Sequence, residues 1–243
     1  MVRMLLVRGM IAGAVAGLAA LVFGFVFGEP GIEGGIAFED RHATHAGVDL
    51  VGRGVQSTLG LAVALVLYGI AIGGIFALVY AVLYGRLGRL SPRGSAAVLA
   101  LVAFLAVIVV PFVKYPANPP GASDPDTISE RTAFYLAMVL ASVALAAAAT
   151  MLGRKLAGRL GAWNAFLVAV ATYLVAIGLV MRALPPVDEA PPGFPATVLY
   201  EFRLASLGAQ LTFWAVLGLV FGAVVDRGGR RADRGAGMRS GAP

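Results

Sequence analysis

The 243-residue chain contains no cysteine, and only 13% of its residues are charged. The missing thiols exclude disulfides, thiolate metal sites and a catalytic cysteine. The scarcity of charge is unlike a soluble protein, in which about 25% of residues are charged. Hydrophobic residues instead make up 59% of the chain, so much of its surface has to face something other than water.

The chain also lacks the short motifs of common enzymes. It has no Walker A sequence, no dinucleotide-binding fingerprint, no HExxH pair and no Ser-His-Asp arrangement. We therefore predict that the protein is not an enzyme and does not hydrolyse ATP. An intramembrane enzyme is disfavoured as well, because the apolar segments carry no acid/base pair.

Six apolar runs are long enough to cross a membrane, since about 20 helical residues span about 30 Å of hydrocarbon. They cover residues 9–27, 59–84, 96–113, 133–152, 162–181 and 205–225, and none contains Asp, Glu, Lys or Arg. Open strands cannot span lipid because their backbone groups would be unsatisfied. The sequence therefore predicts an all-α, polytopic helical bundle of six transmembrane helices. The first run could instead be a secretory signal, but it is long for one and lacks small residues at its end.

Basic residues alternate along the chain in a way that predicts orientation. The N-terminus, the second and fourth connections and the C-terminal tail together hold thirteen basic residues and two acids, whereas the other three connections hold six basic residues and eleven acids. Because Lys and Arg are retained in the cytoplasm, we predict cytoplasmic termini and three hairpins that open outward. The basic residues lie beside the spans, so their expected partner is the lipid bilayer and not a nucleic acid.

The organisation predicted from these features is a six-helix membrane domain over residues 1–226. An Arg/Gly-rich cytoplasmic tail over 227–243 is predicted to be disordered. Glycines at four-residue spacing, above all Gly9, Gly13 and Gly17, predict close helix packing within the chain or against a partner. Three polar residues near the spans are candidates for hydrogen bonds between helices: Gln56, Asn164 and Gln210.

The first outward connection contains both histidines of the chain. His42 and His45 are three residues apart, which places them on one face of a helix. Nearby carboxylates complete a candidate metal-ligand set, which comprises Glu39, Asp40, His42, His45 and Asp49. Imidazole with carboxylate suits divalent Co, Ni, Zn or Cu. The alternative is a solvated polar loop that holds two histidines by chance.

A run of unusual sequence in the second outward connection carries a family resemblance. Residues 114–120 read KYPANPP, and residues 124–127 read DPDT. Together with FGEP at 27–30, RGVQ at 53–56 and LYGIAIGG at 67–74, this run resembles the CbtA family of predicted cobalt transporter subunits. The resemblance covers nearly the whole chain except the tail.

The resemblance implies a bacterial inner-membrane subunit that takes up cobalt, with cobalt(II) as the transported ion and no permanently bound cofactor. It also implies a small single-helix partner, CbtB, whose histidines supply further ligands; an oligomer is compatible with the sequence. On this hypothesis, five residues of the second outward connection shape the ion's entrance: Lys114, Asn118, Asp124, Asp126 and Arg131. The competing hypothesis is a non-transporting membrane subunit that acts as a scaffold in a larger complex.

Overall fold

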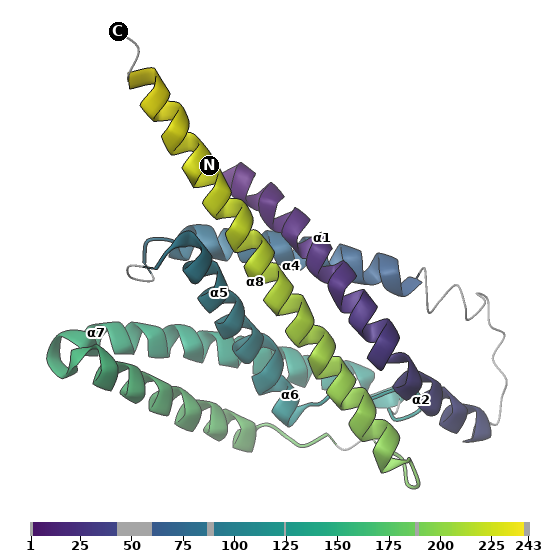
Figure 1. Cartoon of the computed structure of the whole chain (residues 1–243). Helices are drawn as coiled ribbons and strands as arrows, with labels where there is room; N and C mark the ends of the chain where they lie inside the picture. Colours follow the sequence, from purple (N-terminus) through teal and green to yellow (C-terminus); the bar gives the residue numbers. More distant parts are fainter. Residues whose placement is uncertain (1, 43–59, 87–89, 124, 188–189, 241–243) are drawn as a thin grey trace. The chain divides into compact units, whose positions relative to one another are not determined.

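The computed structural model describes residues 2–42, 60–86, 90–123, 125–187 and 190–240, and every element within them is helical (Figure 1). The chain divides into two compact units. Unit 1 comprises Met1–Glu29, Thr44–Val102 and Gly208–Pro243, and unit 2 comprises Pro30–Ala43 and Ala103–Leu207. The predicted helical membrane bundle is confirmed.

In unit 1, helix α1 (Val2–Phe27) packs backbone against backbone on α4 (Leu61–Leu83). A Cβ added at Gly13 would overlap the carbonyl of Gly69, and one added at Gly9 would overlap that of Gly73. Because the later residue of α1 meets the earlier residue of α4, the two helices are antiparallel. The close packing predicted for this glycine stripe is confirmed, and its partner is another helix of the same chain.

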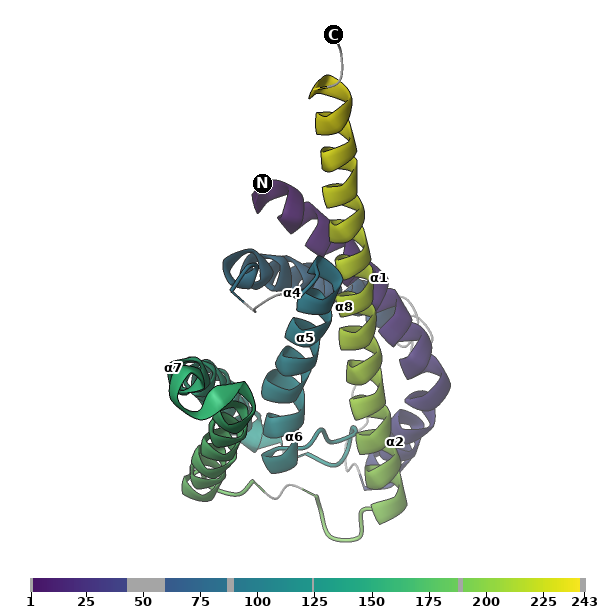
Figure 2. The same cartoon turned by 60° about the vertical axis from the view of Figure 1, so that its left-hand side comes forward.

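The part of helix α8 (Ala196–Ser240) that follows residue 207 belongs to unit 1. This part of α8 packs against α5 (Pro92–Ala103) (Figure 2). A Cβ added at Gly218 would lie 2.6 Å from the Cβ of Ala100, so the two helices are close where both residues are small. The rings of Phe76 and Tyr80 on α4 meet Phe221 of α8 edge-on, at 5.3 and 5.0 Å between centroids. Small residues therefore bring α5 to α8, and aromatic rings fill the space between α8 and α4.

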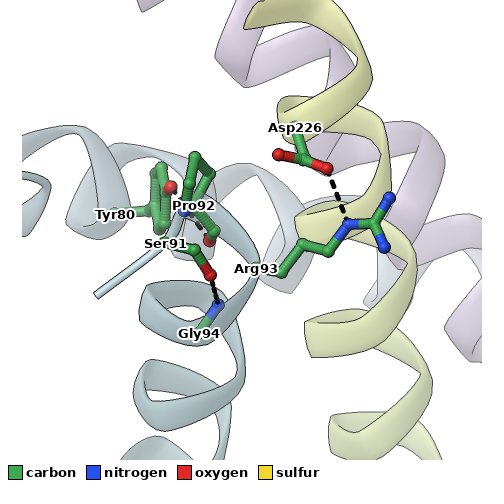
Figure 3. A network of polar contacts seen from close by, with 6 residues as sticks. All are labelled: Tyr80, Ser91, Pro92, Arg93, Gly94 and Asp226. Atoms are coloured by element: carbon green, nitrogen blue, oxygen red, sulfur yellow. Dashed lines mark hydrogen bonds and ion pairs between the residues drawn. The ribbon is translucent and has the colours of Figure 1, made fainter. Parts of the chain in front are cut away.

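Polar contacts hold the first turn of α5 at one end of unit 1 (Figure 3). The hydroxyl of Tyr80 donates to the carbonyl of Pro92 at 3.2 Å, and the backbone N–H of Gly94 donates to Ser91 Oγ at 3.1 Å. The second bond caps the helix N-terminus. Arg93 Nε also pairs with Asp226 Oδ2 of α8 at 2.8 Å.

Unit 2 is built around the longest helix, α7 (Ile128–Ala183), which is a hairpin and not one rod (Figure 1). Gly161 has φ +76° and ψ 159°, and these values lie outside the helical region. Glycine adopts them at little cost because it has no Cβ. The chain reverses there, and the arms over 128–160 and 162–183 pack on each other. These arms contain the predicted spans 133–152 and 162–181, so a 56-residue helix accounts for two crossings.

Four shorter elements complete unit 2. The helix that begins as α5 continues through a π-helical segment, η2 (Phe104–Val109), into α6 (Val110–Lys114). A short turn, η3 (Pro125–Thr127), precedes α7. The first outward connection contains a 14-residue helix, α2 (Glu29–His42), which the apolar pattern did not predict. The disordered tail over 227–243 stays a prediction, and α8 itself ends at Ser240.

Candidate functional site

The candidate site lies in unit 2, where α2 carries most of the predicted metal ligands that the structure describes. One face of α2 is packed: Gly31 faces Phe202 of α8, Gly34 faces Val198, and Phe38 is buried with its ring 4.8 Å from that of Phe194. The acidic side chains of Glu33, Glu39 and Asp40 are exposed. Helix α2 is therefore amphipathic: its small and aromatic residues lie on the packed face, and its carboxylates lie on the exposed face.

The candidate ligands lie partly on this helix. Glu39 and Asp40 are on its last turn, and His42 is the last residue of α2, although its side chain lies outside the described part of the structure. His45 and Asp49 also lie outside the described residues. Within the described part of the chain, no three His, Asp or Glu side chains converge into a metal-binding group. The five-residue set therefore stays a prediction.

Residues 115–123, which we call the proline segment, pack directly against α2. Pro119 is fully buried, and a Cβ added at Gly35 would lie 3.1 Å from the Cβ of Pro119. Gly121 has φ +72°, and a Cβ there would lie 3.1 Å from the Cβ of Glu39. Gly35 and Gly121 thus allow the proline segment to lie flat on α2, beside the acidic turn.

Arg203 of α8 joins the proline segment to the third outward connection. Its Nε donates to the carbonyl of Ala117 at 3.3 Å, and one terminal nitrogen donates to Asn118 Oδ1 at 2.9 Å. Asn118 was predicted to shape the ion's entrance, and the structure makes it an acceptor for this guanidinium. The planar fork of arginine suits two acceptors on neighbouring residues.

Tyr115 makes a second link between connections. Its side chain is buried, its ring lies 6.3 Å from that of Phe134, and its hydroxyl donates to the carbonyl of Pro185 at 2.8 Å. Burial raises the pKa of the Tyr115 phenol above its usual value. The phenol therefore keeps its proton at neutral pH and remains a donor to Pro185.

The other predicted entrance residues lie near this assembly. Arg131 donates to Ser123 Oγ at 2.7 Å, and the ammonium of Lys114 lies 5.8 Å from the centre of the Tyr115 ring. Asp126 is exposed on η3, and Asp124 lies outside the described residues. The structure thus places Lys114, Asn118 and Arg131 in contact with the proline segment or within it. None of these contacts tests their role toward an ion.

The predicted hydrogen bonds between helices concern three residues. Asn164 donates from Nδ2 to the carbonyl of Leu160 on its own helix at 3.1 Å. Gln210 Oε1 is buried, with no hydrogen-bond partner among the described residues. Gln56 lies outside the described part of the chain. Bonds from one helical element to another instead come from residues that the sequence analysis did not select, notably Tyr80 to the carbonyl of Pro92 and Tyr135 to that of Val107.

Sequence reasoning missed Arg203 because it counted this residue only as a charge in an outward connection. The available signal was position, since Arg203 sits beside the last apolar run and would be costly there without acceptors. Tyr115 entered the sequence analysis only as part of the KYPANPP run at 114–120. Only tertiary contacts show that these two side chains tie the connections to one another.

The comparisons with known proteins identify the family of the chain. No curated protein and no solved structure matches the chain. The family model for CbtA, described as a probable cobalt transporter subunit, matches residues 2–226. That match covers α1, α2, the proline segment, both arms of α7 and the apolar part of α8, and it stops where the Arg/Gly-rich tail begins. The chain is therefore a multi-pass membrane protein that belongs to the CbtA family of probable cobalt transporter subunits.

Proposed function

We propose that this chain is the permease-like membrane subunit of a bacterial cobalt uptake system and moves cobalt(II) across the inner membrane. Both termini are cytoplasmic in this proposal, so α2 and the proline segment face outward. The support for this direction is the distribution of charge, because basic residues concentrate on the opposite set of connections.

The observation that carries the proposal is the acidic face of α2. The carboxylates of Glu33, Glu39 and Asp40 are exposed on a helix whose other face is held by α8 and the proline segment. Fixed negative charge at the mouth of a membrane protein raises the local concentration of divalent cations. Oxygen ligands from these carboxylates, with imidazole from His42 and His45, suit Co²⁺.

The proline segment supplies the rigidity that such a collecting surface needs. It contains prolines at three of its nine positions, and it is anchored by Pro119 on α2 and by Arg203 on α8. Fixed φ angles limit the conformations of this segment. In the proposal, Lys114, Asp124, Asp126 and Arg131 shape the entrance beside it.

A partner subunit fits the small number of ligands in this chain. The family description itself includes the word subunit. With two histidines and no cysteine, this chain would use further imidazoles from a small single-helix membrane protein. The partner has to be expressed with the chain in any assay of function.

The test is uptake of radioactive cobalt by bacteria that lack their own cobalt importers. Cells that express the chain with the histidine-bearing partner should accumulate more cobalt than cells with either protein alone. Accumulation no higher than that of cells with an empty vector would exclude the proposal. Purification of the chain as a stable part of a large complex, without metal, would then support the scaffold hypothesis.

A second variant tests the candidate ligands themselves. His42→Ala combined with His45→Ala should lower cobalt uptake by about tenfold at low external cobalt, because metal sites lose about 10–100-fold in affinity when supporting groups are removed. Glu130, which is exposed in the first turn of α7 and not part of the candidate ligand set, offers a matched control as Glu130→Gln. Equal uptake by the double histidine variant and the control would remove both histidines from the ligand set.

A further inference from the structure

The interior of the α7 hairpin contains a pair of polar side chains that the outward connections do not explain. Ser142 is completely buried, and its Oγ lies 2.8 Å from the hydroxyl of Tyr173 on the other arm. Ser142 is at the middle of the predicted span 133–152, and Tyr173 is close to the middle of 162–181. The pair therefore sits near mid-depth of the membrane, where polar groups are costly and often functional.

The hydrogen bonding of this pair leaves capacity for a ligand. Each hydroxyl has one hydrogen and two lone pairs, and the single bond between them uses one hydrogen and one lone pair. Neither hydroxyl makes another hydrogen bond within the described part of the chain. The pair therefore presents free lone pairs and one unused donor between the two arms, where Ser142 is completely buried and Tyr173 is partly buried.

A soft ligand lies one turn away on the same face. Met138 is completely buried opposite Ile177, four residues before Ser142, and Tyr173 packs against the same cluster. The hairpin also brings Met138 of the first arm and Met181 of the second arm into one cluster. A thioether one helical turn from two hydroxyl oxygens completes a neutral donor set, and such a set favours softer transition metals over Mg²⁺.

The backbone carbonyl of Val107 offers a third oxygen, because of the proline in α6. Pro111 has no backbone N–H, so the carbonyl of Val107 four residues earlier loses its α-helical donor. The helix is π-helical at this point, and such segments often mark functional sites. The hydroxyl of Tyr135 donates to the Val107 carbonyl at 3.5 Å, which is long for a hydrogen bond. Tyr135 lies seven residues before Ser142, on the same face of the first arm.

We propose that the Ser142 and Tyr173 hydroxyls, with Met138, form a mid-membrane binding station for a partly hydrated divalent transition-metal ion, approached past the Val107 carbonyl and Tyr135. The proposal rests on the proposed function, since it assigns the station to the transported ion. Hydroxyl and carbonyl oxygens replace part of the ion's hydration shell, and the thioether selects the metal. A neutral station also fits spans without ionisable residues, because it binds the ion weakly enough to release it.

The chain offers matched control hydroxyls on the same two helices. Thr150 of the first arm and Thr172 of the second are exposed, and each donates to the carbonyl four residues before it. Thr172 is the immediate neighbour of Tyr173. Thr150→Val and Thr172→Val therefore remove a hydroxyl from each arm without touching the station.

The first experiment measures cobalt uptake at equal amounts of membrane-inserted protein. Ser142→Ala and Tyr173→Phe should each raise the half-saturating cobalt concentration by about tenfold, as loss of one group around a metal does, whereas both threonine variants should match the wild type. Met138→Leu should make Mg²⁺ a stronger competitor of Co²⁺, which a purely structural methionine would not do. If the wild type transports cobalt and the station variants behave like the threonine variants, the station is wrong and the proposed function stands.

The second experiment does not depend on transport. Because the chain has no cysteine, Ser142→Cys provides a single thiol for a small methanethiosulfonate reagent in purified protein. Ser142 is completely buried, so the reagent reaches this thiol only if a path such as the one proposed for the ion exists, and a thiol that is never labelled would overturn the inference. Co²⁺ should slow this labelling, and Mg²⁺ should slow it less. An unchanged labelling rate with Co²⁺ would overturn the inference whatever the uptake assay shows, whereas protection without uptake would count against the proposed function alone.

Discussion

The interiors of the two units differ in where their polar contacts lie. In unit 1, backbones meet across glycines, as at Gly13 and Gly69, and polar contacts gather at the N-terminal turn of α5. In unit 2, hydroxyl and guanidinium groups reach carbonyls on other elements, as Tyr115 and Arg203 do. A glycine contact is a close van der Waals contact between backbones and supplies no side-chain ligand atom. Lone pairs on hydroxyls and carbonyls, in contrast, can also bind a cation. The ion-binding groups proposed for this chain accordingly lie in unit 2.

The largest expected effect comes from breaking the glycine contact of unit 1. Gly13→Val would place side-chain atoms where the Gly69 backbone lies, and backbone cannot move aside as a side chain can. We expect the free energy of unfolding to fall by at least about 3 kcal/mol, the upper end of typical overpacking costs. The measurement is thermal unfolding of the purified protein in lipid nanodiscs.

Gly24→Ala is the matched control on the same helix, because no atom lies within 4 Å of its added Cβ. This variant should unfold close to the wild-type temperature. A Gly13 variant as stable as the Gly24 variant would show that α1 and α4 are not in backbone contact.

The next effect in size concerns the guanidinium that holds the proline segment. Arg203→Ala removes two hydrogen bonds from a charged donor, and we expect a loss of about 2 kcal/mol. Protease cleavage within residues 115–123 should also become faster. Arg203→Lys should recover only part of this loss, because an ammonium does not reproduce the two-pronged geometry.

Arg182→Ala controls for loss of positive charge, since Arg182 is exposed in the last turn of α7. It should leave both stability and protease resistance unchanged. Equal sensitivity of the two alanine variants would mean that charge, and not the contacts to Ala117 and Asn118, protects the segment.

A smaller effect is expected at Tyr115. Tyr115→Phe keeps the ring against Phe134 but removes the bond to Pro185, which should cost about 1 kcal/mol. Tyr115→Ala also removes the ring and should cost clearly more. Thermal unfolding of both variants measures the difference, and a Tyr115→Phe variant as stable as the wild type would show that the hydroxyl contributes nothing.

The smallest effect belongs to the ion pair of unit 1. The Arg93 side chain is 56% exposed and that of Asp226 is 12% exposed, so solvent screens the pair, and Arg93→Gln should cost less than about 1 kcal/mol. Unfolding temperatures at low and high salt should differ less for Arg93→Gln than for the wild type. A loss as large as that of Arg203→Ala would show that unit 1 also depends on polar contacts.

Much of the fold follows from local sequence. For each part that does not, a physical reason can be identified. Apolar runs without charge predicted the spans, and the triple at Gly9, Gly13 and Gly17 predicted close packing, because both signals depend on composition and helical spacing. Helix α2 was missed because its glycines and acids have no long apolar period. The hairpin turn at Gly161 could not be placed because its left-handed φ depends on the packing of the two arms.

The candidate site divides in the same way. The sequence analysis selected Asn118 and Arg131 from an unusual motif, but only the structure shows that Arg203 and Ser123 bind them. It selected the acids of α2 by their proximity to two histidines, while the structure shows which of them are exposed. The metal-ligand role of these residues remains a prediction, with His45 and Asp49 outside the described part of the chain.

The sequence by itself determined that this protein is a helical membrane protein, how charge divides between its connections, and to which family it belongs. These properties depend on composition and on motifs a few residues long, so they survive without knowledge of contacts. Tertiary structure alone decided that Ser142 meets Tyr173, that Tyr135 faces the Val107 carbonyl, and that Arg203 holds the proline segment. These pairs are separated by 28 to 85 residues, and a hydrogen bond over such a separation depends on how whole helices pack.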